Sequence, residues 1–185
     1  MNKIILLIIC IFSLSAFAVQ PQVVVETNHG TIEIDLFQDK APLTVKNFLK
    51  YVDAKFYDGT IFHRVINNFM IQGGGFTEKM VEKKTVGSIK NEATNGLRNE
   101  VATLAMARTS DPHSASAQFF INVSDNSFLN HTSQDVNGWG YAVFGKVTQG
   151  MHVVNRIKML KTGQIGSYSD VPMDPVIIKS IRRKK

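Results

Sequence analysis

One arginine and one glutamine lie in a stretch that is otherwise rich in aromatic and aliphatic residues. Residues 62–74 read FHRVINNFMIQGG, with Arg64 near the start and Gln72 near the end. An arginine is always protonated and presents several N–H donors in a rigid arrangement. Arg64 could therefore donate hydrogen bonds to a group held in an adjoining apolar pocket. The pattern also fits a pair of core strands with an arginine at their rim, and the residues alone leave both interpretations open.

A second cluster combines a polar side chain with paired aromatic rings. Residues 117–122 read AQFFIN, so that Gln118 precedes Phe119 and Phe120. Because successive side chains of a strand point to opposite faces, we expect one phenylalanine to fill the interior and the other to face outward. Two packed layers without a functional role would explain the same pair of rings.

Other kinds of chemistry have little support. The single cysteine, Cys10, lies in the N-terminal apolar run, and no Gly-x-Ser-x-Gly motif occurs. The five histidines are widely dispersed and none has a closely spaced partner, so we expect no metal site. The three glycines at residues 73–75 are not followed by Gly-Lys-Ser/Thr, which excludes a phosphate-binding loop of that type. No cofactor is expected.

Composition indicates an ordinary globular domain. The chain has 185 residues, of which 44% are hydrophobic and 19% are charged. These values exclude a disordered tail protein, a collagen-like repeat and a polytopic membrane protein. No internal repeat or linker is visible, so one domain is expected.

The N-terminus has the pattern of a secretory signal peptide. Lys3 is followed by an uncharged apolar run at residues 4–12 and by Ala16-Phe17-Ala18, which fits a cleavage site. We therefore expect a signal peptide at residues 1–18 and a single domain at residues 19–185. The run is too short for a comfortable membrane span, although an uncleaved anchor is the alternative. A periplasmic location is expected, with full secretion as the other possibility.

Basic residues concentrate toward the C-terminus. Residues 146–185 contain 9 Lys and Arg against 2 Asp and Glu, and the chain ends in Arg182-Arg183-Lys184-Lys185. We expect this run to be a solvated tail, with attachment to an anionic surface as the alternative. Aromatic residues do not alternate with the basic ones, so we expect no nucleic-acid partner.

Periodicity predicts eight short strands and two helices. The expected strands cover residues 23–25, 32–36, 61–65, 70–73, 102–107, 118–123, 141–147 and 176–181. The expected helices cover residues 43–53 and 151–159, and the first has an apolar face of Val45, Phe48, Leu49 and Val52. This content favours a mainly β fold, a closed eight-stranded antiparallel β-barrel capped by two α-helices. Periodicity alone fits a sandwich nearly as well.

Three separated motifs resemble one known family. Residues 62–74, residues 116–121 (SAQFFI) and residues 143–147 (VFGKV) are similar to the motifs of the cyclophilin-type peptidyl-prolyl cis-trans isomerases, in the same order and spacing. The resemblance extends from residue 23 to about residue 181 and is closest to the exported bacterial cyclophilins. It implies an eight-stranded barrel with two helices, and an enzyme that acts on proline-containing polypeptides without a cofactor and assists the folding of exported proteins.

The resemblance also implies roles for individual residues. Arg64 would donate to the prolyl nitrogen, Gln72 would hold the backbone near proline, and Phe69 would complete this catalytic group. The substrate-binding residues would be Met70, Ala107, Gln118, Phe120, Phe128, Leu129 and Tyr141. Of these, Met70, Phe120 and Leu129 would form the proline pocket together with Phe69, and Ala107 would line the neighbouring groove.

Three positions depart from the family pattern. Many members have Trp where this chain has Phe128, and that Trp helps to bind cyclosporin, so weak cyclosporin binding is expected. Tyr141 replaces a His found near the pocket in many members, and we expect activity to be retained. Gly75 replaces the usual Asp of the first motif, as it does in the exported bacterial group. A monomer is expected.

Two further hypotheses remain open. The same groove could bind proline-containing segments without catalysis, which would be recognised by slow exchange despite measurable binding. A barrel could also carry a small apolar ligand, which would require a cavity open at the end of the barrel.

Overall fold

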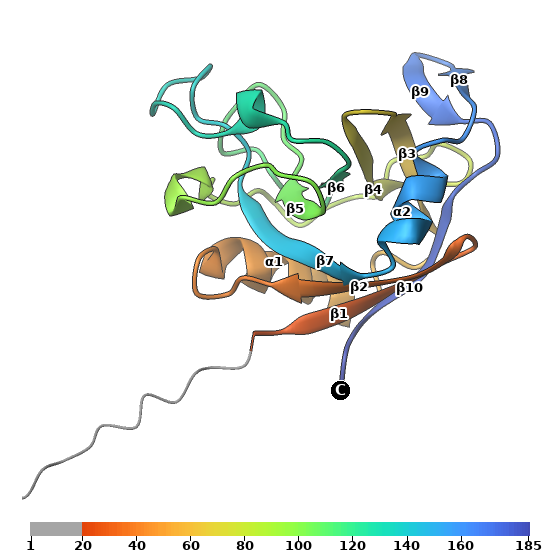
Figure 1. Cartoon of the computed structure of the whole chain (residues 1–185), viewed down its shortest axis with the longest axis horizontal. Helices are drawn as coiled ribbons and strands as arrows, with labels where there is room; N and C mark the ends of the chain where they lie inside the picture. The colour runs from red at the N-terminus through yellow and green to blue at the C-terminus, as the bar shows by residue number, and fades with distance from the viewer. Residues whose placement is uncertain (1–19) are drawn as a thin grey trace, which may run out of the picture.

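The computed structural model describes residues 20–185, so the expected signal peptide lies outside the described residues. Eight antiparallel strands form a closed barrel in the order β1-β10-β3-β4-β6-β5-β7-β2 (Figure 1). The barrel strands are β1 (Gln22–Thr27), β2 (Gly30–Leu36), β3 (Thr60–Ile66), β4 (Met70–Thr77), β5 (Thr103–Met106), β6 (Phe119–Asn122), β7 (Val143–Gln149) and β10 (Ile177–Arg183). The barrel architecture expected from the sequence is confirmed, and the sandwich alternative is wrong.

Two helices accompany the barrel, as the apolar periodicity predicted. Helix α1 (Pro42–Asp53) begins with Pro42 and buries the predicted face, including Phe48. The Glu92 carboxylate accepts hydrogen bonds from the backbone N–H groups of Leu43 (3.0 Å) and Thr44 (2.8 Å), which stabilises the start of this helix. Helix α2 (Met151–Ile157) is two residues shorter than expected. No helix within residues 20–185 is long and apolar enough to cross a membrane.

The interior of the barrel is filled with aromatic and branched side chains. Phe62, Phe119 and Phe144 are fully buried, and α1 adds Phe48 to the same cluster. The Phe48 and Phe119 rings meet edge to face with their centroids 5.6 Å apart. Such aromatic pairs contribute about 0.5–1.5 kcal/mol beyond their burial. This packed interior argues against a barrel that carries an apolar ligand inside it.

One pair of strands outside the barrel was not expected from the sequence. Strands β8 (Thr162–Ile165) and β9 (Tyr168–Pro172) form a separate hairpin that projects beyond the barrel beside β3 (Figure 1). Two short 3-10 turns, Ala93–Asn95 and Ser127–Leu129, interrupt the long loops. β4 extends four residues beyond the strand expected at residues 70–73. Phe76 and Thr77 pair with Ile61 and Thr60 of β3, and residues 74–75 lie at an irregularity of the register.

The basic run at residues 182–185 is not the free tail that was expected, because its first two residues extend a strand, although residues 183–185 are exposed as expected. Arg182 and Arg183 belong to β10, and each makes two hydrogen bonds to a carboxylate, of Asp58 and Asp53 respectively. Lys184 pairs with Glu33 at 2.5 Å. The Arg182 guanidinium holds the pKa of the Asp58 carboxyl below its ordinary value. Arg182 and Arg183 therefore join the C-terminal strand to α1 and to the turn that follows it, and Lys184 joins the end of the chain to β2.

Candidate active site

A β-bulge determines where Arg64 points. Across the β3–β4 pair, Phe62 lies opposite Gly73 and Arg64 lies opposite Gln72, so His63 is the extra residue of β3. Without the bulge, Phe62 and Arg64 would point to the same face, because side chains alternate along a strand. The extra residue reverses this alternation, so that Phe62 fills the core while Arg64 faces outward with Gln72.

The two adjacent phenylalanines of β6 separate the core from the site. Phe119 belongs to the interior of the barrel, and Phe120 packs on the outer side against Met70, Ala105, Leu129 and Val143. The opposite directions of the two rings confirm the expected alternation. Phe120 is nonetheless only 3% exposed, because the long loops cover it. An apolar floor thus forms outside the barrel, next to the polar pair Arg64 and Gln72.

A cavity of about 100 Å³ opens over this apolar floor. Its lining residues are Arg64, Phe69, Met70, Gln72, Ala107, Arg108, Phe120, Leu129 and Tyr141. Drug-sized ligands generally occupy about 300–1,000 Å³, so this cavity suits one small ring or side chain. Eight of these nine residues were among the ten predicted from the sequence, and the structure brings them together around one cavity.

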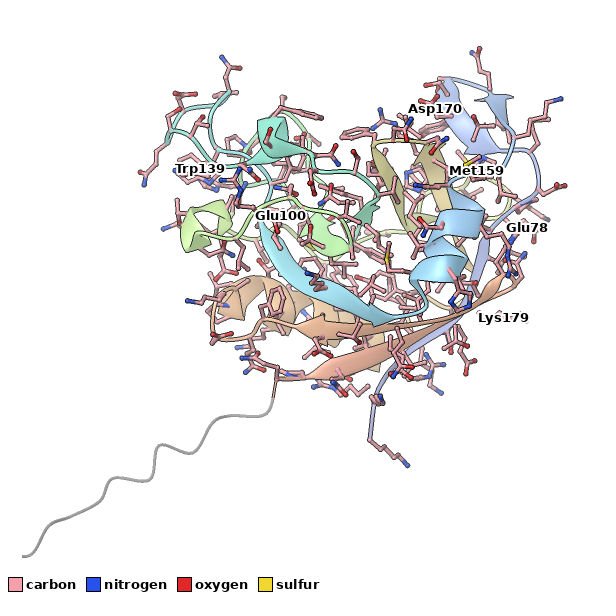
Figure 2. The ribbon with its side chains drawn as sticks, in the orientation of Figure 1. Glu78, Glu100, Trp139, Met159, Asp170 and Lys179 are labelled. Atoms are coloured by element: carbon pink, nitrogen blue, oxygen red, sulfur yellow. The ribbon has the colours of Figure 1, made fainter. Side chains whose placement is uncertain are left out.

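Arg64 lies at the edge of the cavity and is half exposed. Its Nε atom is 3.8 Å from Asp170 Oδ2, and Asp170 is the only acidic partner of Arg64 within residues 20–185. Asp170 comes from β9, on the side of the hairpin that faces β3 and β4 (Figure 2). Its φ of 61° lies in the left-handed region, which is uncommon for residues other than glycine. The hairpin missed by sequence reasoning therefore places an anionic group beside the site's arginine.

A second cavity of about 250 Å³ adjoins the first. The two cavities share Gln72, Ala107 and Arg108, and the second is also lined by Gln118. Gln118 does not line the smaller cavity, but it accepts a hydrogen bond from Gln72 at 3.0 Å. Ala107 thus lies between the two cavities, as expected for a residue of a neighbouring groove.

Phe128 does not line either cavity. Its side chain is 73% exposed and packs against Phe69, with the ring centroids 5.5 Å apart. Tyr141 does line the smaller cavity and meets the Phe120 ring edge to face at 5.7 Å. Phe128 therefore belongs to the outer rim, and Tyr141 to the wall.

Sequence reasoning did not select Arg108 as a site residue, although the structure places it in the wall of both cavities. Its guanidinium lies over the Tyr141 ring, 4.5 Å from the centroid, and its Nε donates to the backbone oxygen of Gly140 at 3.1 Å. The guanidinium is thereby held in a fixed orientation. The position next to Ala107 was the available signal, since neighbouring residues of one segment line the same groove.

His63 lies behind the site rather than in it. The ring is 5% exposed, packs against Phe76, and leaves its Nδ1 atom buried with no hydrogen-bond partner among the described residues. Burial, assisted by the nearby positive charge of Arg64, lowers the pKa of His63 to about 4. His63 is therefore neutral near pH 7. Across residues 20–185 no three His, Cys, Asp or Glu side chains gather in a way that could hold a metal ion.

Comparison with known proteins shows the family. The family model described as "Cyclophilin type peptidyl-prolyl cis-trans isomerase/CLD" matches residues 22–183. The peptidyl-prolyl cis-trans isomerase cyp18 of Streptomyces antibioticus is 62% identical over 156 residues, which is 84% of this chain and 94% of that protein. The peptidyl-prolyl cis-trans isomerase B of Escherichia coli (strain K12) is 61% identical over 155 residues, covering 84% and 94%.

A solved structure shares the fold as well. The crystal structure of a cyclophilin-type peptidyl-prolyl cis-trans isomerase of Cryptosporidium parvum, in the presence of the dipeptide Ala-Pro, superposes with a TM-score of 0.71. The two chains are 28% identical, and the match covers 89% of this chain and 99% of the other.

Proposed function

The chain belongs to the cyclophilin-type peptidyl-prolyl cis-trans isomerases, and we propose that it accelerates rotation about X-Pro bonds of exported proteins, with Arg64 stabilising the twisted transition state. The activity itself is that of the family. The role of Arg64, the function of each pocket residue and the export of the chain are proposals, and each rests on its own observations.

The reaction needs no bond to be broken. Rotation about a peptide bond crosses a barrier of about 18–20 kcal/mol, which arises from resonance between the amide nitrogen and the carbonyl. At the twisted transition state the prolyl nitrogen becomes pyramidal and recovers its lone pair. A donor directed at that nitrogen binds the twisted state more strongly than the planar one, and this difference is what accelerates a reaction. Lowering the rotation barrier of the bound peptide by about 4 kcal/mol gives about a thousandfold acceleration.

The observation that carries the proposal is the position of Arg64 beside a small cavity with an apolar floor. Met70, Phe120 and Leu129 are nearly or fully buried around a space that suits a pyrrolidine ring. Arg64 is a permanently charged donor at the edge of this space. A proline ring in the cavity brings its own nitrogen toward the edge where the guanidinium lies.

Gln72 and the neighbouring cavity provide contacts to the rest of the polypeptide. Gln72 lies directly opposite Arg64 and borders both cavities. We propose that its amide group holds the backbone on one side of the proline ring. Phe69 and Tyr141 close the apolar wall, and Phe128 extends it outward. The oligomeric state that we propose is a monomer.

Cyclosporin is expected to bind weakly. Phe128 is exposed at the outer rim, where many family members have a Trp that helps to bind the drug. Phenylalanine retains the apolar ring but lacks the indole N–H donor. The change should therefore reduce affinity for cyclosporin more than it reduces affinity for proline-containing peptides.

The location proposed is the periplasm, with full secretion as the alternative. The support is the sequence of the first eighteen residues, in which Lys3 precedes an apolar run and a small-x-small site at Ala16-Phe17-Ala18. N-terminal sequencing of the protein from cell fractions tests this proposal. A soluble chain that begins at Val19 in the periplasmic fraction is expected, whereas a full-length chain in the membrane fraction would contradict it.

The isomerase function is tested on the chain of residues 19–185. NMR exchange spectroscopy of an Ala-Pro peptide measures cis-trans exchange directly, and refolding of a protein limited by prolyl isomerisation measures the folding role. We expect the protein to make both the peptide exchange and the refolding much faster than spontaneous prolyl isomerisation, which takes tens to hundreds of seconds. A folded protein that binds the peptide but leaves exchange at its spontaneous rate would instead be a proline-binding module.

A further inference from the structure

A chain of hydrogen bonds runs from the cavity to the protein surface. Gln72 Nε2 donates to Gln118 Oε1 at 3.0 Å, and Gln118 Nε2 donates to Glu82 Oε1 at 3.2 Å. Glu82 lies on the exposed loop after β4 and lines only the second cavity. We propose that Glu82 is a positioning residue, which acts through Gln118 to fix the direction in which the Gln72 amide faces the substrate. This inference rests on the isomerase function proposed above.

The direction of the Gln72 amide follows from the donors and acceptors that Glu82, Gln118 and Gln72 carry. An ionised carboxylate only accepts hydrogen bonds, so the part of Gln118 that meets Glu82 is its NH₂ group. The Gln118 carbonyl is then turned toward Gln72, which must donate its own NH₂ group. As a result, Gln72 Oε1 is the acceptor left for the substrate, and no donor from residues 20–185 occupies it.

Without the carboxylate, the two glutamines alone would not define this direction. A pair of amides can form one hydrogen bond in either sense, because each amide carries both donors and an acceptor. One sense presents the Gln72 carbonyl to the cavity, and the other presents its NH₂ group. Only the carbonyl can accept from a backbone N–H of a bound polypeptide. Glu82 thus selects substrates that offer an N–H next to the proline ring.

Gly75 provides the space that this arrangement needs. A Cβ atom at this position would overlap the Gln118 side chain, which passes directly over the Gly75 backbone. Any larger residue would push Gln118 away from Glu82 or from Gln72. In this chain, Gly75 therefore leaves the room in which Gln118 reaches both Gln72 and Glu82.

Kinetics with matched variants test the proposal. The variants are Glu82→Gln and Glu82→Ala. The control is Glu78→Gln, which removes the same charge from an exposed residue just after β4 (Figure 2). Glu78 is not among the side-chain hydrogen-bond partners of either glutamine. Each protein is assayed on an Ala-Pro peptide and on analogues in which a backbone N–H next to the proline ring is replaced by an ester oxygen. Thermal unfolding confirms that every variant is folded.

We expect wild type and Glu78→Gln to prefer the N–H peptide over one ester analogue by about three- to tenfold, the effect of one hydrogen bond. Both Glu82 variants should raise KM for the N–H peptide by about that factor, keep kcat within about twofold and lose the preference. Gly75→Ala, which displaces Gln118 by a different route, should do the same. Glu82 variants that match Glu78→Gln in KM and preference would overturn the proposal. Absence of catalysis by wild type would instead overturn the isomerase function.

Discussion

Arg64 and Asp170 approach within 3.8 Å of each other, although they come from the barrel and from the β8–β9 hairpin respectively. Both side chains are roughly 40% exposed, at 43% and 39%. Exposed ion pairs contribute about 0–1 kcal/mol, so this contact adds little to the stability of the fold. We expect its effect to be local, in limiting the directions that the guanidinium takes at the edge of the cavity.

The Asp170→Asn variant tests this restraint. We expect kcat/KM to fall by about two- to fivefold, because a wider range of guanidinium positions is populated, and the free energy of unfolding to change by less than about 1 kcal/mol. Asp174→Asn removes a charge from the same exposed region and should have no effect on kinetics. An Asp170→Asn enzyme with wild-type kinetics would show that the carboxylate does not restrain Arg64.

Variants of Met70 and Met106 distinguish an effect on substrate binding from an effect on core stability. Both side chains are 2% exposed, but Met70 lines the small cavity while Met106 packs in the barrel interior. Replacement of either by Ala should cost about 2–5 kcal/mol of unfolding free energy. Only Met70→Ala should also raise KM for an Ala-Pro peptide, measured well below the unfolding temperature. Equal KM values for the two variants would argue against proline binding in this cavity.

The Phe128→Trp variant tests the proposed reason for weak cyclosporin binding. Because Phe128 is exposed at the rim, a larger ring can be accommodated there without repacking the core. We expect cyclosporin affinity to rise at least about tenfold, which corresponds to about 1.4 kcal/mol, while kcat/KM on a peptide changes less than about twofold. Titration calorimetry and the exchange assay measure the two quantities. Unchanged affinity would place the cause of weak binding at another residue.

The buried His63 ring should make the free energy of unfolding depend on pH. Its pKa is about 4 in the folded protein, because of burial and then the Arg64 charge, against about 6.5 in the unfolded chain. The unfolded chain therefore binds the additional proton between these values, and stability falls as the pH decreases from 6.5 to 4. The two pKa values correspond to a loss of about 3 kcal/mol over this range.

Urea unfolding of wild type and His63→Leu at several pH values measures this dependence. The wild-type curve should fall steeply between pH 6.5 and 4, and the His63→Leu curve should be flatter there. His152→Gln, which changes an exposed histidine, should follow wild type. The carboxylates of Asp53 and Asp58 have lowered pKa values in the fold, so their contribution is lost mainly below about pH 4 and does not overlap. Parallel wild-type and His63→Leu curves would be inconsistent with a buried neutral ring.

Much of the fold could be predicted because the signals are periodic. The apolar alternation of residues 32–36 and the face formed by Val45 and Phe48 reflect burial against one core, and both elements occur as expected. The β8–β9 hairpin could not be found in this way, because most of its residues are exposed and it contains glycine and proline. Asp170, and with it the partner of Arg64, was missed for the same reason.

The candidate site was predictable in its residue types but not in its geometry. Strict alternation would place Phe62 and Arg64 on the same face, and only the bulge at His63 separates them. No local pattern marks this bulge. The contact between Glu82 and Gln118 is equally hidden, since Glu82 lies in a polar loop and Gln118 lies 36 residues later. Long-range contacts of this kind depend on the closed barrel as a whole.

The most direct test of the central claim compares cis-trans exchange of an Ala-Pro peptide for wild type, Arg64→Lys and Arg64→Ala, by NMR exchange spectroscopy. If the guanidinium stabilises the twisted prolyl nitrogen, Arg64→Ala should lose at least about tenfold in kcat with a smaller change in KM. Arg64→Lys should fall between the two, because it keeps the charge but not the rigid donors. A folded Arg64→Ala enzyme with wild-type kcat would contradict the account.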